Sequence, residues 1–99
     1  MKDIETAVTH ITPADGNIFT DLGFEPVEAA KLLIKADLMI DIQQWVLSNK
    51  LKQEDAAKIL KVSRPRLSDV MTGKIRKFTI DALVDMLENA GLHVTVHVA

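Results

Sequence analysis

The feature that most constrains the fold is residues 53–67, QEDAAKILKVSRPRL, where two helix signals are separated by a turn of only a few residues. The first signal, Gln53–Leu60, is rich in alanine and has strong helix propensity. Ser63 then suits the N-cap of a second helix, because its hydroxyl can accept a hydrogen bond from a backbone N–H of the first turn. A connection this short forces the two helices to pack closely. Ala56 and Ala57 are small where the second helix must cross the first.

Four larger aliphatic side chains are spaced to fill the wedge between these two helices: Leu60, Val62, Leu67 and Val70. The second helix is expected to end at about Met71, with Gly73 placed after it where a left-handed residue closes a helix. This spacing is typical of a helix-turn-helix, whose second helix lies in the DNA major groove. An ordinary helical hairpin is the alternative, because Ala and Leu at these spacings occur in many small helical proteins.

The predicted outward face of the second helix carries side chains that can read base pairs. An Arg in the first turn can reach a guanine edge through two hydrogen bonds, and an Asp can accept one from a cytosine amino group. A Pro there fits the first turn of a helix and could touch a thymine methyl group. The residues predicted to contact bases are Arg64, Pro65, Ser68 and Asp69.

Positive charge is concentrated in the same part of the chain. Residues 1–49 hold three Lys against eight acidic residues, a net charge of −5, whereas residues 50–77 hold nine basic residues against three acidic ones, a net charge of +6. A chain of overall charge −2 with one basic block is typical of a protein with a polyanion-binding face, although a scattered, solvated basic face is the alternative. The coincidence of the basic block with the helix pair favours DNA binding. The residues predicted to contact or flank the DNA backbone are Gln53, Lys61, Ser63, Arg66, Thr72, Lys74, Arg76 and Lys77.

A long helical pattern runs from Pro26 to about Ser48. Pro costs little at a first helical position, because that N–H has no partner within the helix. At about 100° per residue, the apolar residues fall on two opposed stripes, namely Val27, Ile34, Leu38 and Trp45 on one, and Ala29, Leu32, Ala36, Ile40 and Leu47 on the other. Such a helix is either buried from both sides or broken near Ala36–Asp37 into two helices. Either arrangement favours a second chain as a partner.

The last part of the chain predicts one helix followed by one strand. Thr79 can cap a helix that Gly91 ends, and residues 92–98 then alternate strictly between apolar and polar side chains, as a half-buried strand does. This strand has no partner within its own sequence except the stretch Glu5–Thr12. Antiparallel pairing with a second copy is therefore predicted, because a two-fold interface is self-complementary. The predicted dimer contacts are Leu92, Val94, Val96 and Val98.

Several classes of protein are disfavoured by what the sequence lacks. The chain has no Cys, which excludes a disulfide framework and a thiolate zinc site. Four positions on one strand would place His93 and His97 about 13 Å apart, too far to share a metal ion. No nucleophile elbow or phosphate-binding glycine loop is present. We predict no catalytic residue, metal or cofactor, and a cytoplasmic location, because no signal peptide or membrane-spanning stretch is seen.

The helix pair also resembles a known family. The stretch LKQEDAAKILKVSRPRLSDVMTGK is similar to the helix-turn-helix of Xre/Cro/cI-type regulators, whose pattern runs L-T-Q, two small residues, a hydrophobic residue, a turn Gly, V-S and a recognition helix ending in G-K. Lys61 departs from this pattern, because it stands where the family has the turn Gly. A non-Gly residue in left-handed geometry costs about 1 kcal/mol there. Gln53 and Thr72 match phosphate-contacting places of the family. Three positions match base-facing places: Arg64, Pro65 and Asp69.

The wider layout is similar to that of HigA-type antitoxins, with NIFTDLGF before the long helix and KFTIDALVDMLENAGLHVTVHV after the motif. The resemblance covers about residues 17–98. It implies a mainly α fold, a five-helix lambda-repressor-like helix-turn-helix domain with one C-terminal β-strand. The predicted parts are an N-terminal segment, residues 1–25, partly flexible with a short helical turn; the DNA-binding domain, residues 26–91; and a dimerisation strand, residues 92–99.

The resemblance implies a homodimeric repressor that binds a palindromic operator in double-stranded DNA, regulates its own operon and neutralises a RelE/HigB-like ribonuclease toxin. The acidic first half of the chain suits a basic toxin. One alternative is a plain Xre-type, phage-like regulator without a toxin, and the acidic half together with the two-sided long helix favours the antitoxin over it. Another is a pure protein-binding antidote with a vestigial helix-turn-helix, which Arg64 and Arg66 on the predicted recognition helix argue against.

Overall fold

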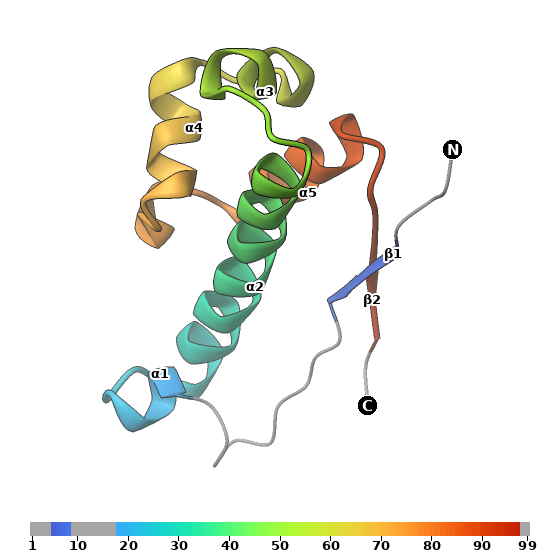
Figure 1. The fold of residues 1–99 in the computed structure, drawn as a ribbon. Coiled ribbons are helices and arrows are strands. Elements are labelled where there is room, and N and C mark those ends of the chain that lie inside the picture. Colours follow the sequence, from blue (N-terminus) through green and yellow to red (C-terminus); the bar gives the residue numbers. More distant parts are fainter. Residues whose placement is uncertain (1–4, 9–17, 98–99) are drawn as a thin grey trace.

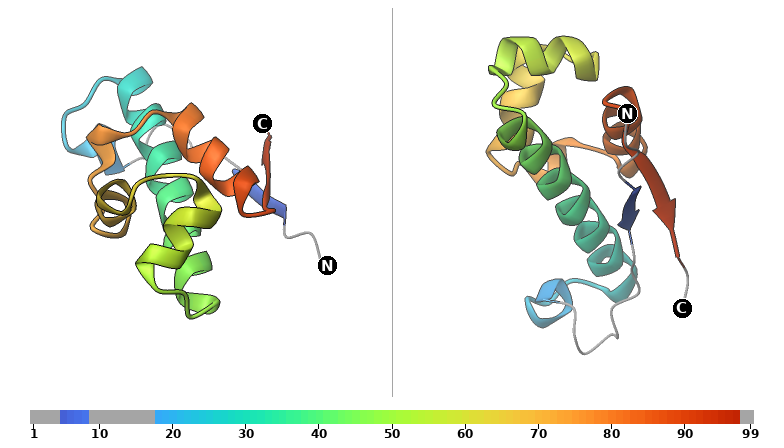
Figure 2. Two further views of the ribbon diagram at one scale, coloured as in Figure 1. Left: turned by 90° about the horizontal axis from the view of Figure 1, so that it is seen from above. Right: turned by 45° about the vertical axis from the view of Figure 1, so that its right-hand side comes forward.

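The computed structural model describes residues 5–8 and 18–97 and is arranged around one long central helix (Figure 1). In chain order its elements are β1 (Glu5–Val8), α1 (Ile18–Asp21), α2 (Pro26–Ser48), α3 (Gln53–Leu60), α4 (Arg64–Met71), the 3-10 turn η2 (Ile75–Lys77), α5 (Ile80–Asn89) and β2 (His93–Val96). Helices α3 and α4 lie at the C-terminal end of α2, α1 lies at its N-terminal end, and the strand pair runs beside it (Figure 2). The five predicted helices and the C-terminal strand are confirmed. Partial flexibility is predicted for residues 1–25; of these, residues 5–8 and 18–25 are described, the others lie outside the described ranges, and the flexibility stays a prediction.

Helix α2 is a single unbroken helix, so the predicted alternative of a break near residues 36–37 is wrong. The two predicted stripes also fail to describe its buried face. Three stripe residues are exposed by 46% to 67%: Val27, Ile40 and Leu47. Three residues that lie on neither stripe are buried: Met39, Ile42 and Val46. The reason is that α2 contacts α1, α4, α5, β1 and η2 at different places along its length. Its buried face therefore turns around the helix axis instead of following one line.

The main core lies where α2 meets α3, α4 and α5. Of the predicted wedge residues, three are fully buried, namely Leu60, Leu67 and Val70, and Val62 packs against them partly exposed. Ala56 and Ala57 are buried as well, which agrees with the close packing predicted for small side chains in α3. Phe78, which follows η2, is 2% exposed and adds the largest fully buried side chain.

The boundaries of α5 follow the predicted signals. The Thr79 hydroxyl oxygen accepts a hydrogen bond from the N–H of Ala82 over 3.1 Å, so the predicted N-cap is confirmed. Asp81 lies in the first turn, where a negative charge is stabilised by the helix dipole. Gly91 follows the end of α5 with φ +84°, a left-handed conformation that L side chains rarely adopt.

Strand β2 pairs with β1 of the same chain in parallel, from Glu5 opposite His93 to Val8 opposite Val96. The stretch Glu5–Thr12, the one internal partner that the sequence left open, thus supplies the neighbouring strand. Pairing between two copies is therefore not required to give β2 a partner. The expectation of a lone C-terminal strand fails because a four-residue partner near the other end of the chain carries almost no periodic signal.

The predicted dimer contacts are in different environments. Leu92 precedes β2 and is 7% exposed within the core of its own chain, and Val94 packs partly against that core. The N–H of Val94 donates to Glu88 Oε2 over 3.0 Å, so this backbone N–H of β2 already has a hydrogen-bond partner on α5. Val96 is 68% exposed, and Val98 lies outside the described residues. Of the three that the structure describes, Val96 is the residue that a second copy could reach without rearrangement.

Candidate nucleic-acid interface

Helix α4 presents one side to the core and the other to solvent. Leu67 and Val70 bury the inner side. The four residues predicted to contact bases share the opposite side: Arg64, Pro65, Ser68 and Asp69. Arg64 and Pro65 are exposed in the first turn, whereas Ser68 and Asp69 are half-buried one turn later. The structure therefore brings these four side chains together on one accessible helix face.

The turn before α4 sets the direction of this face. Lys61 ends α3 in the left-handed conformation, with φ 60° and ψ 43°, as predicted for the place of the turn glycine. The N–H of Val62 then donates to the Ala57 carbonyl over 3.0 Å, which closes the turn. Ser63 Oγ accepts a hydrogen bond from the N–H of Arg66 over 3.2 Å, so the predicted N-cap of α4 is confirmed. Its cap role leaves the Ser63 side chain at the start of the outward face, where Lys61 is also exposed.

Two amide side chains from the scaffold hold the C-terminal ends of α3 and α4. The last carbonyl groups of a helix have no partner inside it and need one from outside. Gln43 Nε2, on α2, donates to the Val70 carbonyl over 2.8 Å. Asn89 Nδ2, on α5, donates to the Leu60 carbonyl over 3.1 Å. Sequence analysis missed both residues, because the two partners in each bond are 27 and 29 positions apart.

Arg66 lies in the first turn of α4 and holds the segment after α4 against that turn. Its guanidinium carbon lies 4.3 Å from the centre of the Phe78 ring, and Nη1 donates to the Lys77 carbonyl over 3.2 Å. A guanidinium over an aromatic face is attracted by the ring quadrupole. Arg66 therefore fixes η2 beside α4, which places the basic residues of this segment next to the recognition face. This is a positioning role within the chain, in addition to the flanking DNA contact predicted from the sequence.

Asp69 lies between two lysines of the same segment. Its Oδ1 is 3.5 Å from Lys74 Nζ and its Oδ2 is 3.5 Å from Lys77 Nζ. The Asp69 side chain is 23% exposed, whereas the two lysine side chains are 53% and 57% exposed. We call these three residues the Asp69 ion-pair cluster. The cluster joins a predicted base contact to two predicted phosphate contacts.

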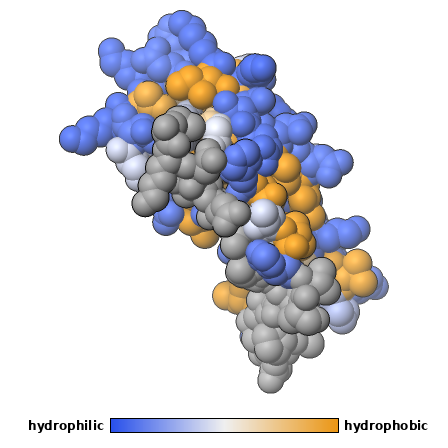
Figure 3. All heavy atoms as spheres, turned by 90° about the vertical axis from the view of Figure 1, so that its right-hand side faces the viewer, coloured by the Kyte–Doolittle hydropathy of each residue, from blue (hydrophilic) through white to orange (hydrophobic). Residues whose placement is uncertain are grey.

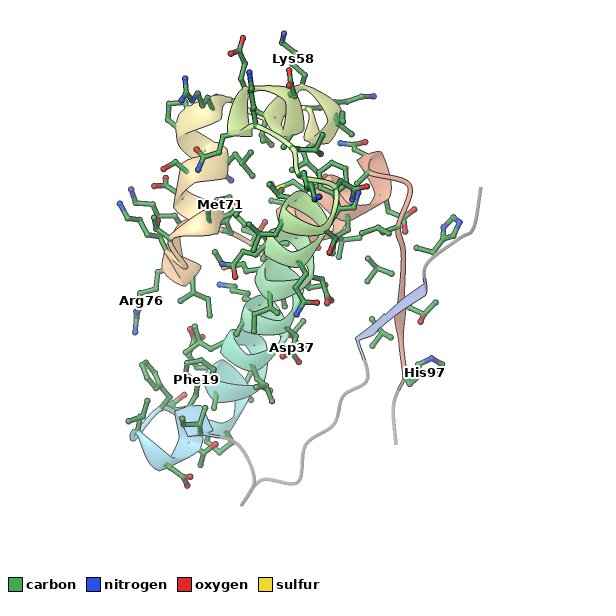
Figure 4. The ribbon with its side chains drawn as sticks, viewed as in Figure 1. Phe19, Asp37, Lys58, Met71, Arg76 and His97 are labelled. Atoms are coloured by element: carbon green, nitrogen blue, oxygen red, sulfur yellow. The ribbon has the colours of Figure 1, made fainter. Side chains whose placement is uncertain are left out.

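The remaining predicted backbone contacts surround this cluster. Thr72 is exposed after the end of α4 and donates its hydroxyl to the Ser68 carbonyl over 2.9 Å. Gln53 begins α3 and is half-buried. Arg76 projects from η2 toward the α1 end of the molecule, with its guanidinium carbon 5.4 Å from the centre of the Phe24 ring (Figure 4). The basic segment thus reaches from the recognition face to the loop that joins α1 and α2.

The described part of the chain offers few other sites. Within residues 5–8 and 18–97, no group of three or more His, Cys, Asp and Glu side chains is placed to hold a metal ion. None of the helices that the structure describes is long and apolar enough to cross a membrane.

Comparison with known proteins supports the interpretation of the helix pair. A family model described as a helix-turn-helix domain matches residues 18–99, which is most of the chain. No curated protein matches the sequence significantly.

The strained turn gives a testable prediction. Lys61→Gly should raise the free energy of unfolding by about 0.5–1 kcal/mol, because glycine adopts the left-handed conformation without the steric cost of Cβ. Lys61→Gln is the matched control, since it removes the same charge and keeps the strain, and its stability should stay close to that of the parent chain. Urea denaturation measures both. Equal stability of the two variants would show that Lys61 is not strained.

Proposed function

We propose that the chain, which belongs to the helix-turn-helix domain family, is a sequence-specific DNA-binding transcriptional repressor that reads DNA with α4. The observation that carries this proposal is the coincidence of three features on one surface. These are a capped helix with an exposed Arg in its first turn, a polar outward face, and a basic segment fixed beside it by Arg66. An α-helix with its side chains is about 10–12 Å in diameter, which fits the DNA major groove of about 12 Å width.

The proposed contacts divide into those that read sequence and those that set position. Arg64 would donate two hydrogen bonds to a guanine edge, Pro65 would touch a thymine methyl group, and Ser68 would bond to either kind of base. The proposed backbone contacts come from the surrounding residues: Gln53, Lys61, Ser63, Thr72, Lys74, Arg76 and Lys77. Ammonium groups that neutralise phosphates supply affinity without sequence preference, and the dependence of affinity on salt follows their number.

Two substitutions separate these roles. Arg64→Ala should weaken binding to a duplex selected from a random library by about 1–3 kcal/mol and relax the preference at one base pair of each half-site. Lys77→Ala should weaken binding to all duplexes alike and reduce the slope of log affinity against log salt by about 0.9. Fluorescence anisotropy at several salt concentrations measures both quantities. If neither variant changed the affinity, α4 would not lie in the groove.

We also propose that two copies bind together on a palindromic site. Two-fold pairing would place the recognition helices about 34 Å apart, one turn of DNA. Exposed Val96 supports a contact through β2, and apolar surface lies among hydrophilic areas on the side of the molecule that carries the strands (Figure 3). A contact through the long helix is the alternative. On that helix Leu32 is buried, so the contact between the two copies would consist of Ile40 and the exposed part of Ala36.

A chain that ends after Gly91 tests the strand contact. It should keep most of its helical circular dichroism, sediment as a monomer and bind the selected duplex much more weakly than the full chain. Val96→Lys is a milder variant that keeps the strand and places a charge on the proposed contact. If the shortened chain were still a dimer at micromolar concentration, the contact would lie elsewhere, on α2.

A second role, as an antitoxin for a basic RelE/HigB-like ribonuclease toxin, is supported by the opposite end of the molecule. Three exposed apolar side chains lie on α1, directly after it and at the start of α2: Ile18, Leu22 and Val27. The same region holds three exposed acidic residues, Asp21, Glu25 and Glu28. Further along α2, burial raises the pKa of the Asp41 carboxyl, and the Asp37 carboxylate raises that pKa further. A cationic partner would offset the repulsion between these two carboxylates. A plain regulator without a toxin remains the alternative function.

Two matched variants test the protein partner. Val27 and Leu47 are each 67% exposed near opposite ends of α2. Val27→Ser should weaken co-purification with a basic protein encoded by a neighbouring gene, because it removes apolar contact area beside the acidic residues. Leu47→Ser should leave that complex intact. Both variants should bind DNA normally. If the full chain formed no complex with the neighbouring gene product, the antitoxin role would be excluded and a plain regulator would be left.

A further inference from the structure

The Asp69 ion-pair cluster places a negative charge on the surface that the proposed function brings against phosphates. Asp69 is the only acidic residue in the sequence of α4. Each of its carboxylate oxygens lies 3.5 Å from a different lysine ammonium, Lys74 on one side and Lys77 on the other. A carboxylate in this place repels DNA unless it accepts a specific hydrogen bond. Its position therefore needs an explanation beyond stability.

Local geometry connects the carboxylate to the lysines that it contacts. The N–H of Lys74 donates to the Asp69 carbonyl over 2.9 Å, so the backbone after α4 folds back on the residue whose side chain pairs with Lys74. The Lys77 carbonyl is held by Arg66. Both lysines thus leave a fixed backbone and end at one carboxylate. By contrast, the Glu54–Lys58 pair on α3 spans 4.0 Å, and its side chains are far more exposed than Asp69.

We propose that Asp69 limits non-specific DNA binding by acting as an internal counter-ion for Lys74 and Lys77. This inference rests on the proposed binding of DNA through α4. Each lysine must exchange a carboxylate for a phosphate before it contributes to affinity, and the cost of that exchange applies to every DNA sequence. Only a site that also satisfies Arg64 and its neighbours supplies enough contacts to offset it. A cost shared by all sequences leaves the ratio of specific to non-specific affinity unchanged, but it keeps non-specific complexes, which depend on phosphate contacts, weak.

The competing role for Asp69 is the base contact expected from the sequence, in which its carboxylate accepts a hydrogen bond from a cytosine amino group. The two roles predict opposite changes on removal of the charge. A counter-ion lowers affinity for all DNA, so its removal tightens binding. A base contact supplies affinity for one sequence, so its removal weakens binding to that sequence alone.

The test is Asp69→Asn, with Asp85→Asn as the matched control. The control removes the same charge from an exposed position on α5, outside the proposed DNA-binding surface. Anisotropy is measured against two probes, a duplex selected by the parent chain and a random-sequence duplex of about 30 base pairs, which covers two half-sites and their flanks. Asp69→Asn should tighten binding to the random duplex by roughly two- to thirty-fold, since two ion pairs no longer have to be broken. It should tighten binding to the selected duplex by a similar factor, because both complexes break the same two ion pairs.

The salt dependence provides a second readout that a merely structural role would not move. In Asp69→Asn the slope of log affinity against log salt should steepen by up to about 0.9, because one negative charge no longer offsets the two ammonium groups at the phosphates. In a Lys74→Ala/Lys77→Ala background the same substitution should gain at most a small part of that effect. Asp85→Asn should change neither the slope nor the two affinities beyond the effect of one distant charge.

Three results would overturn the inference. Weaker binding of Asp69→Asn to the selected duplex, with unchanged binding to the random one, would assign Asp69 to a base contact. Equal effects of Asp69→Asn and Asp85→Asn would show that Asp69 acts only through the net charge of the protein and not through its pairing with the two lysines. In both cases the parent chain still binds DNA and the proposed function stands. If the parent chain bound neither probe at any salt concentration, the proposed function and this inference would fail together.

Discussion

Between α3 and α4 the chain turns sharply within three residues, and the orientation of every side chain on α4 depends on that turn (Figure 1). The turn is possible because Ala56 and Ala57 let the two helices approach closely and because Lys61 accepts a left-handed backbone. Leu60 and Leu67 are then fully buried on either side of the corner. Close-packed interiors tolerate little displacement. A shift of this corner would therefore redirect Arg64 and the whole outward face.

Side chains from α2 and α5 also hold the paired helices α3 and α4 in position. Gln43 and Asn89 each donate to a carbonyl near the end of one of the paired helices, and Arg66 holds the segment after α4. A single hydrogen bond of this kind contributes on the order of 1 kcal/mol to stability. These three contacts make the position of α4 a property of the whole domain. The long helix α2 thereby links the recognition face to the α1 end of the molecule.

The local features of this fold could be predicted from the sequence, and the long-range ones could not. Caps at Ser63 and Thr79 and the left-handed turn at Lys61 depend on neighbouring residues, so they follow from residue type and spacing. The buried face of α2 did not follow, because its neighbours change along the helix and no single stripe describes it. The pairing of β2 with β1 joins the two ends of the chain, and a four-residue strand carries too little pattern to reveal it.

The candidate site shows the same division. Periodicity alone was enough to group the outward residues of α4, since they lie on one helix face. The contacts that decide how these residues act were not predictable, because they join α4 to η2: Arg66 on Phe78, and Asp69 between two lysines. The spacing of residues in the sequence predicts which side chains share a helix face. Which of those side chains form ion pairs or ring contacts within the protein depends on the position of the segment after α4.

The central claim is that α4 and the segment after it form the DNA-binding surface, while α1 and the start of α2 are left for another partner. Titration of the selected duplex into isotope-labelled protein, followed by backbone amide chemical shifts, tests it directly. The account predicts that the largest shifts fall within residues 61–77 and that residues 18–32 change little. The largest shifts at residues 18–32, with those of α4 unchanged, would contradict it.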